Sequence, residues 1–335
     1  MTHRYLSLRW TGCLLLAAAF SCRAEVDELR IAQQYGLQYL PLIVMQDRGL
    51  IEKHASAQGL PALRVDWVKF SGSNVMIDGV LSGTLHVASG GFPGLALVWS
   101  KTRENLDVRG AAAMCSMPTY LNTRNAGVRT VADFTAKDRI ALPAIKSSPQ
   151  AVLLQMAAEK AYGPGQHARL DSLTVSMGHP DATIALLSGS GGVTAHFSTS
   201  PFHEQELADA NIHTVISSDD VLGGPSTLTV VWTTSKFRAA NPKVYEAFVH
   251  ALEESMVMIA RDPRSAAESY LRIAKSRESV EDIMRMLENP RVAYTTTPQN
   301  VMKFAEFMYR VGTIKVRPQS WKDFFFPNVH ALAGS

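Results

Sequence analysis

The stretch VLSGTLHVASGG (Val80 to Gly91) decides the predicted fold, because in it a helix ends and the chain turns into a strand. Gly83 is a typical helix end, and a Gly-Gly pair closes the strand. The stretch LLSGSGGVTAHF (residues 186–197) has the same order, about a hundred residues later. The repeat predicts two similar α/β lobes rather than one long sheet, although two unrelated helix ends would give the same pattern.

The flanking segments also alternate between strand and helix. ELRIAQQYG (28–36) and LRVDWVKFSGS (63–73) read as strands, and residues 40–60 between them as one helix closed by a glycine. The next helix is expected to begin at Asn74. Such alternation predicts parallel pairing with helices on both faces of the sheet. From residue 241 onward the pattern is mostly helical.

Composition is that of a soluble globular protein: 335 residues, 46% hydrophobic and 19% charged, enough for two domains or one large one. The first residues read as a secretory signal, with Arg4 and Arg9 before an apolar core at 13–20 that is too short to span a bilayer. Cleavage after Ala24 gives a soluble exported protein. Lipidation at Cys22 is the alternative.

Charge and cysteine content narrow the function classes. Cleavage after Ala24 leaves 30 basic and 30 acidic residues, so nothing argues for a nucleic-acid partner. Cys115 would be the one remaining cysteine, and it reads as a small buried residue rather than a nucleophile. G-x-S-x-G, H-E-x-x-H and G-K-[ST] motifs are all absent from the sequence. We therefore predict neither an enzyme nor a metal or cofactor site.

The segment ALPAIKSSPQAVLLQMAAEK (141–160) predicts a helix start that favours an anion. Ser148 is placed to cap the helix and Pro149 suits its first position. No acid occurs from Pro143 to Ala158, where a helix normally accepts one against its positive end, and Lys146 adds a further positive charge. We interpret this end as a binding point for an anionic group.

Four further loops at predicted strand ends carry small polar residues, and ligands of open α/β sheets bind at that edge. These loops contain Tyr35-Gly36, Ser71-Gly72-Ser73-Asn74, Ser89-Gly90-Gly91-Phe92 and His196-Phe197-Ser198-Thr199. Phe92 and Tyr35, beside glycines, are expected to form pocket walls. His179 is expected to line a cleft, with Asp181 capping a helix opened by Pro180. A catalytic or metal pair is the alternative for His179 and Asp181. For His196 we expect a ligand contact by its ring.

Taken in order, these segments resemble the periplasmic solute-binding proteins of ABC importers, in the nitrate, sulfonate and taurine group. The resemblance rests on DRGLIEKH (47–54), FSGSNVMIDGVLSGTLHVASGGFPGL (70–95), VRTVADFTAKDRIALPAIKSSPQAVLLQMAAEK (128–160) and HPDATIALLSG (179–189). One departure is SGGVTAHF after the second Leu-Ser-Gly, where many relatives have an acidic or amide residue and then Asp-Ala. That departure leaves the ligand open.

The resemblance implies a type II periplasmic-binding-protein fold, with two lobes that are each a mixed, mostly parallel sheet flanked by helices. Its expected divisions are a signal at 1–24, a first lobe of 25–116 plus 230–335, and a second lobe of 117–229. The chain would cross between the lobes near 116–121 and 225–233. Carried over onto this sequence, the ligand contacts are Tyr35, Gly36, Ser71, Gly72, Asn74, Gly91, Phe92, Thr119, Ser147, Ser148, Gln150, His179 and His196.

The implied function is capture of a small anion, such as an organic sulfonate, taurine or nitrate, in the periplasm. The implied partners are a permease in the inner membrane and its ATPase, and the default oligomeric state is a monomer. Two alternatives remain open. One is an enzyme on the same fold, related to synthesis of a thiamine pyrimidine precursor, although this chain lacks that group's cysteine cluster. The other is a periplasmic receptor that reports its ligand to a sensor.

Overall fold

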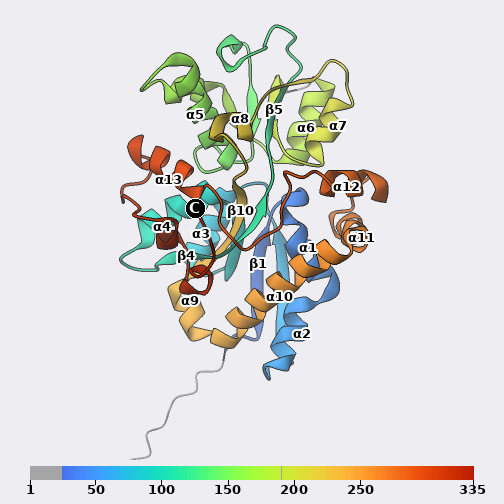
Figure 1. Ribbon diagram of the computed structural model, residues 1–335, viewed down its shortest axis with the longest axis vertical. Coiled ribbons are helices and arrows are strands. Elements are labelled where there is room, and N and C mark those ends of the chain that lie inside the picture. The colour runs from blue at the N-terminus through green and yellow to red at the C-terminus, as the bar shows by residue number, and fades with distance from the viewer. Residues whose placement is uncertain (1–24, 190) are drawn as a thin grey trace, which may run out of the picture.

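The computed structural model describes residues 25–189 and 191–335, and it contains two separate five-stranded sheets (Figure 1). The predicted signal segment, with its alternative lipidation at Cys22, lies outside the described residues. Within those residues, no helix combines the length and the apolar character that crossing a bilayer requires.

The two sheets have the same internal plan. In each, the second strand in the order has parallel neighbours on both sides, and the sheet continues from its central strand through antiparallel strands. The first sheet has the order β2 (Arg64–Lys69), β1 (Glu28–Gln33), β3 (Val87–Gly91), β10 (Thr227–Thr234) and β4 (Val108–Ser116). The second has the order β7 (Thr174–Ser176), β6 (Ile140–Leu142), β8 (Ala195–Ser198), β5 (Tyr120–Thr123) and β9 (His213–Ser217). The repeated sequence units supply β3 and β8, which hold equivalent places. This confirms the predicted α/β fold with two lobes.

Helices fill the connections and the C-terminal part of the chain. Those before the second sheet are α1 (Leu40–Arg48), α2 (Leu50–Ala57), α3 (Ser73–Ser82) and α4 (Phe92–Thr102). Between the first strand of the second sheet, β5, and the return to the first sheet at β10, the helices are α5 (Pro149–Tyr162), α6 (His179–Ser188), α7 (Phe202–Leu207) and α8 (Ser218–Leu222). Those after it are α9 (Ser235–Ala240), α10 (Pro242–Arg261), α11 (Pro263–Ala274), α12 (Val280–Leu287) and α13 (Val301–Arg310). Short 3₁₀ helices are η1 (Leu37–Tyr39), η2 (Val131–Asp133), η3 (His167–Leu173), η4 (Trp321–Phe324) and η5 (Pro327–Val329).

The chain passes between the sheets twice. Residues 117–119 lead from β4 to β5, and residues 218–226, which include α8, lead from β9 back to β10. The second passage therefore begins earlier than the sequence suggested, because β10 already belongs to the first sheet from Thr227. The predicted lobe boundary at 229/230 falls inside that strand.

Three local predictions were wrong in detail. Residues 40–60 form two helices, because Gly49 adopts a left-handed conformation (φ 59°) between α1 and α2. Gly72, not Asn74, is the residue that precedes α3, and Asp181 lies in the first turn of α6 after Gly178 rather than capping it.

Cys115 is fully buried in β4, and burial raises the pKa of its thiol, as expected for a packing residue.

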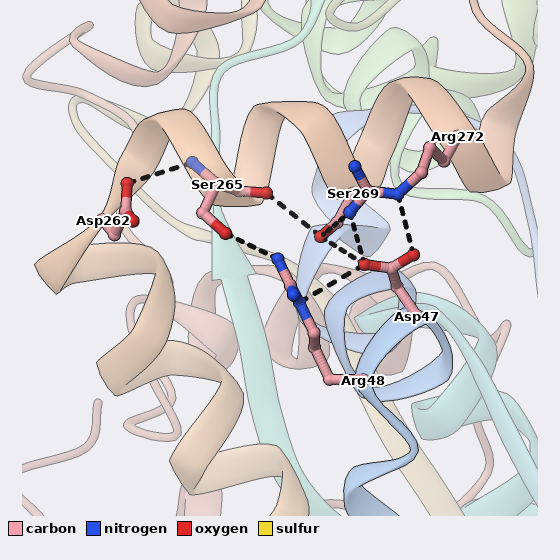
Figure 2. A network of polar contacts seen from close by, with 6 residues as sticks. All are labelled: Asp47, Arg48, Asp262, Ser265, Ser269 and Arg272. Carbon is pink, nitrogen blue, oxygen red and sulfur yellow. Dashed lines mark hydrogen bonds and ion pairs between the residues drawn. The ribbon is translucent and has the colours of Figure 1, made fainter.

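A polar network fixes α11 to α1 (Figure 2). The guanidinium of Arg272 donates to both carboxylate oxygens of Asp47, at 3.1 and 2.7 Å, and Ser269 Oγ donates to the same carboxylate at 2.7 Å. Arg48 donates to Ser265 Oγ at 2.6 Å. These contacts hold α11 against α1.

Candidate functional site

The start of α5 is built as its sequence predicts. Ser148 Oγ accepts a hydrogen bond from the amide of Ala151 at 3.2 Å and donates one to the carbonyl of Ala144 at 2.7 Å. The first turn contains no acidic residue, and Pro149 at its first position has no N–H to donate. The positive end of the helix dipole is therefore not neutralised within its own first turn.

This helix end faces the first lobe across a very small cavity of about 20 Å³. The two lobes come close together there: a Cβ added to Gly91 would lie 2.1 Å from Cδ of Pro149. A water molecule needs about 10–15 Å³ on this measure, so the cavity has room for about one water. It is lined by Gln34, Gln38, Tyr39, Ser73, Gly91, Pro143, Ser148, Pro149, Gln150, His179, Leu228 and Thr229. Among the residues that the structure describes, neither an Asp nor a Glu lines this cavity.

The rim of the small cavity joins α3 to the second lobe. Ser147 Oγ donates to Asn74 Oδ1 at 2.5 Å, although the two residues are 73 positions apart. A Cβ added to Gly72 would lie 2.3 Å from the carbonyl oxygen of Pro143, so only glycine permits this approach. Nearby, Ser71 packs close to Gly178: a Cβ added to Gly178 would lie 3.1 Å from Cβ of Ser71. The structure therefore has the two lobes in direct contact at the predicted loops.

Behind the cavity, His179 begins a buried chain of polar side chains. His179 Nδ1 lies 2.8 Å from His196 Nε2, and His196 Nδ1 lies 2.5 Å from Glu206 Oε1. Glu206 is fully buried and also accepts hydrogen bonds from Thr183 Oγ1 and Asn122 Nδ2, both at 2.7 Å. Burial first, and then the neighbouring His196, lower the pKa of His179 well below its usual value. His179 is therefore a neutral imidazole near pH 7.

A second, larger cavity of about 630 Å³ lies beside the first and shares Gln34 with it. Its walls come from the β1–η1 loop, from α6 and α7, and from the loop after α11. In the described part of the chain, its charged lining consists of the cations Lys69, Lys275 and Arg277 and the carboxylate Glu278. Glu278 accepts hydrogen bonds from Ser276 and Gln205. Burial, and then repulsion by Lys275, lower the pKa of Lys69.

Most predicted contact residues lie at these two cavities or their rim. Gly91, Ser148, Gln150 and His179 line the small cavity, and Tyr35 and Gly36 line the larger one. Ser71, Gly72, Asn74 and Ser147 form the rim contacts described above.

The structure places three predicted contacts elsewhere. Phe92 is fully buried against Phe324 and Phe304, so it is a core residue and not a pocket wall. Thr119 is fully buried in the first passage between the sheets, with its amide bonded to Ser218 Oγ at 3.1 Å. The ring of His196 is fully buried between His179 and Glu206 and does not line either cavity.

Sequence analysis did not predict several residues that line the cavities or lie directly behind them. Gln34 and Gln38 flank the predicted Tyr35-Gly36 loop, and their nearness to it was a usable signal. Gln38 Nε2 donates to the carbonyl of Tyr35 at 2.9 Å, and its buried Oε1 has no hydrogen-bond partner among the described residues. Glu206 and Lys275 had no such signal, because only the tertiary fold brings them to the site.

The fold of this chain is similar to that of several solved structures. The chain aligns with the alkanesulfonate-binding protein SsuA from Xanthomonas axonopodis pv. citri bound to MOPS, with a TM-score of 0.69, 17% identity, and coverage of 90% of this chain and 98% of that one. The periplasmic nitrate-binding protein NrtA from Synechocystis PCC 6803 gives a TM-score of 0.67 and 14% identity, with coverage of 89% and 84%.

A third similar structure is a Candida albicans gene product described as having the generic periplasmic binding protein fold, with a TM-score of 0.65, 17% identity, and coverage of 89% and 94%. No family model and no curated protein matches the sequence. The predicted resemblance to the sulfonate and nitrate group is confirmed by these structural neighbours. The chain has the two-lobed α/β fold of the periplasmic binding proteins.

Proposed function

We propose that this chain is the periplasmic substrate-binding component of an ABC importer, which captures a small anionic solute between its lobes and delivers it to a membrane permease. One observation carries the proposal. The small cavity receives residues from both lobes, including the start of α5, and no carboxylate of residues 25–189 or 191–335 lines it. The structural neighbours include proteins whose descriptions name sulfonate and nitrate binding.

The recognition chemistry follows from the groups at the cavity. The amide of Gln150 is the first N–H of α5, because Pro149 has none, and Ser148 Oγ already accepts from Ala151. A hydrogen bond to a charged group contributes about 1.5–3 kcal/mol, and the helix dipole favours the same charge. A sulfonate or nitrate oxygen meets both conditions, whereas a cation meets neither.

The size of the small cavity implies that the ligand enters an open form. A space that holds about one water cannot admit a sulfonate group without separation of the lobes. Hinge closure around a ligand is a common motion of two-lobed binding proteins. The larger cavity, lined by Lys69, Lys275 and Arg277, would then attract the anion to the gap between the lobes. We propose that the protein acts as a monomer without a cofactor.

A thermal-shift screen of the mature protein (residues 25–335) tests the proposal. The probes are small sulfonates, nitrate, carboxylates and neutral pyrimidines. A ligand at a thousand times its dissociation constant stabilises the folded state by about 4 kcal/mol, which raises the midpoint by roughly 6 °C for a chain of this length. We expect one anionic class to do so, and the shift to be lost in Ser148→Asp.

The control for that variant is Ser279→Asp, which changes the cap of α12 in the same way. Ser279 Oγ accepts from Asp282 N at 3.0 Å, as Ser148 Oγ accepts from Ala151 N, although Ser279 also donates to the Asp282 carboxylate at 2.7 Å. Aspartate is itself a good cap, so both variants should fold. Unchanged anion affinity in Ser148→Asp, or a shift with neutral pyrimidines alone, would refute the anion site.

A further inference from the structure

The buried chain Glu206–His196–His179 ends at the small cavity, and its hydrogen bonds have a direction. Glu206 accepts from Thr183 and Asn122, which are both donors, so it has the surroundings of an ionised carboxylate. His196 Nδ1 must then carry a proton and donate it to Glu206 Oε1. Whether His196 Nε2 also carries a proton determines which histidine donates the hydrogen bond between His196 and His179.

Burial decides that state. Glu206 and His196 are both 0% exposed, and an uncompensated negative charge at such a depth is unfavourable. A proton on His196 Nε2 makes the pair neutral overall. In that state His196 Nε2 donates to His179 Nδ1, which becomes the acceptor. A neutral His179 then carries its proton on Nε2, the ring nitrogen that His196 does not contact.

We propose that Glu206 and His196 act as positioning residues that fix His179 in one tautomer, so that its Nε2–H serves the small cavity as a permanent hydrogen-bond donor for the anion. His179 lines that cavity, and Phe202 stacks on its ring at 5.5 Å and an interplanar angle of 18°, which holds its orientation. A donor that carries no full charge can stay desolvated without a counter-ion when the ligand leaves. A site of this kind selects an oxyanion over a cation and over a ligand that only donates.

Two further titratable side chains near the chain, His203 and Glu204, belong to α7, and Tyr120 of β5 stacks on the His203 ring at 3.8 Å. His203 Nδ1 lies 3.1 Å from Asn122 Nδ2, and desolvation lowers the pKa of His203 to about 4, so it is neutral at pH 7. Glu204 accepts a hydrogen bond from Ser200 Oγ at 2.7 Å and makes no hydrogen bond to the ring of His179 or of His196 among the described residues. Glu206 is therefore the carboxylate that compensates His196.

Nitrogen NMR of histidine tests the tautomer without any ligand. In ¹⁵N-histidine-labelled protein at pH 7.5, long-range ¹H–¹⁵N correlations distinguish protonated from bare ring nitrogens. We expect both nitrogens of His196 to be protonated, with His179 bare at Nδ1 and protonated at Nε2. A bare Nε2 on His179 would overturn the proposal. In Glu206→Gln, loss of the charge should neutralise His196 and reverse the His179 tautomer, and an unchanged His179 pattern in a folded variant would also overturn it.

Titration calorimetry with methanesulfonate and nitrate tests the consequence, and this readout rests on the proposed function. We expect Glu206→Gln to weaken the binding of the better probe at least tenfold. The matched control Glu204→Gln, two residues away on α7, should change it less than twofold. Equal affinity in both variants would overturn the positioning role. Absence of binding by the wild-type protein would instead overturn the proposed anion ligands, and the NMR pattern would still decide the tautomer.

Discussion

Ser147 Oγ donates a hydrogen bond to Asn74 Oδ1 at 2.5 Å, and this bond joins the two lobes directly. Ser147 is 1% exposed, whereas Asn74 lies on the exposed rim. Both residues are predicted ligand contacts, yet they bond to each other. The contact therefore belongs to the closed arrangement of the lobes, in which the ligand would be enclosed.

Asn74→Ala should weaken anion binding, because it removes a bond that forms when the lobes close. A hydrogen bond of this kind contributes about 1 kcal/mol, which corresponds to roughly a fivefold loss of affinity by calorimetry. The melting temperature of the ligand-free protein should change little. Asp78→Ala, one turn further along α3 and exposed, is the control. Equal affinities in the two variants would show that this contact does not contribute to closure.

Acid should destabilise the protein partly through His203. Burial lowers the pKa of His203 from 6.5 to about 4, so between these values the unfolded chain binds a proton that the folded chain does not. Stability is therefore lost as the pH falls from about 6.5 to about 4, by at most about 1.4 kcal/mol per pH unit. Urea unfolding of His203→Gln should show a shallower fall over that range than the exposed control His250→Gln. Parallel curves would contradict this role.

Arg310 should stabilise the protein through α5. Its guanidinium donates to both oxygens of Glu159, at 2.9 and 2.6 Å, and lowers the pKa of that carboxyl from 4.5 to about 2. This contribution is present above about pH 4.5 and is lost as the pH falls towards 2. A partly exposed pair of this kind stabilises by at most about 1 kcal/mol. We expect Arg310→Gln to melt about 2 °C lower than the wild type at pH 7. The difference should be smaller in about 0.5 M salt, because the electrostatic screening length is then only roughly 4 Å.

The exposed control for that pair is Arg317→Gln, in the segment that follows α13. It should melt like the wild type at both salt concentrations. A deficit in Arg310→Gln that persists in high salt would point to lost packing on Phe307, which the guanidinium also covers at 5.1 Å, rather than to the ion pair.

Lys275 should accelerate capture of an anion. It ends α11 at the larger cavity, close enough to Lys69 to lower the pKa of that residue. Converging positive charge attracts an anion at long range and is screened by salt. Lys275→Gln should lower the association rate about two- to threefold at low salt, measured by stopped flow, with a smaller effect on dissociation. Lys243→Gln, at the start of α10, is the control, and an equal slowing there would refute local attraction.

Local sequence signals predicted the elements well because those signals act within a few residues. Ser148 and Pro149 begin α5 as expected, and Gly83 ends α3 in a left-handed conformation (φ 77°). Gly49 was misread because a glycine inside an apolar pattern does not reveal its dihedral angles. It adopts the left-handed conformation that separates α1 from α2.

The site could be predicted only in part, because long-range packing decides which side chains face the cavity. Phe92 follows Gly90 and Gly91, which end β3 instead of forming the expected turn, and α13 and η4 pack on its ring and make it core. His196 was predicted to contact a ligand with its ring, but the ring is fully buried against Glu206, a partner that no local pattern indicates.

Calorimetric titration of residues 25–335 with methanesulfonate and with its neutral isostere methanesulfonamide is the most direct test of anion capture between the lobes. The two probes have nearly the same shape and differ in charge. We expect one methanesulfonate site per chain, which binds this anion at least a hundredfold tighter than the amide and is lost in Ser148→Asp. Equal affinity for the two probes, or anion binding that Ser148→Asp leaves unchanged, would contradict anion capture at the start of α5.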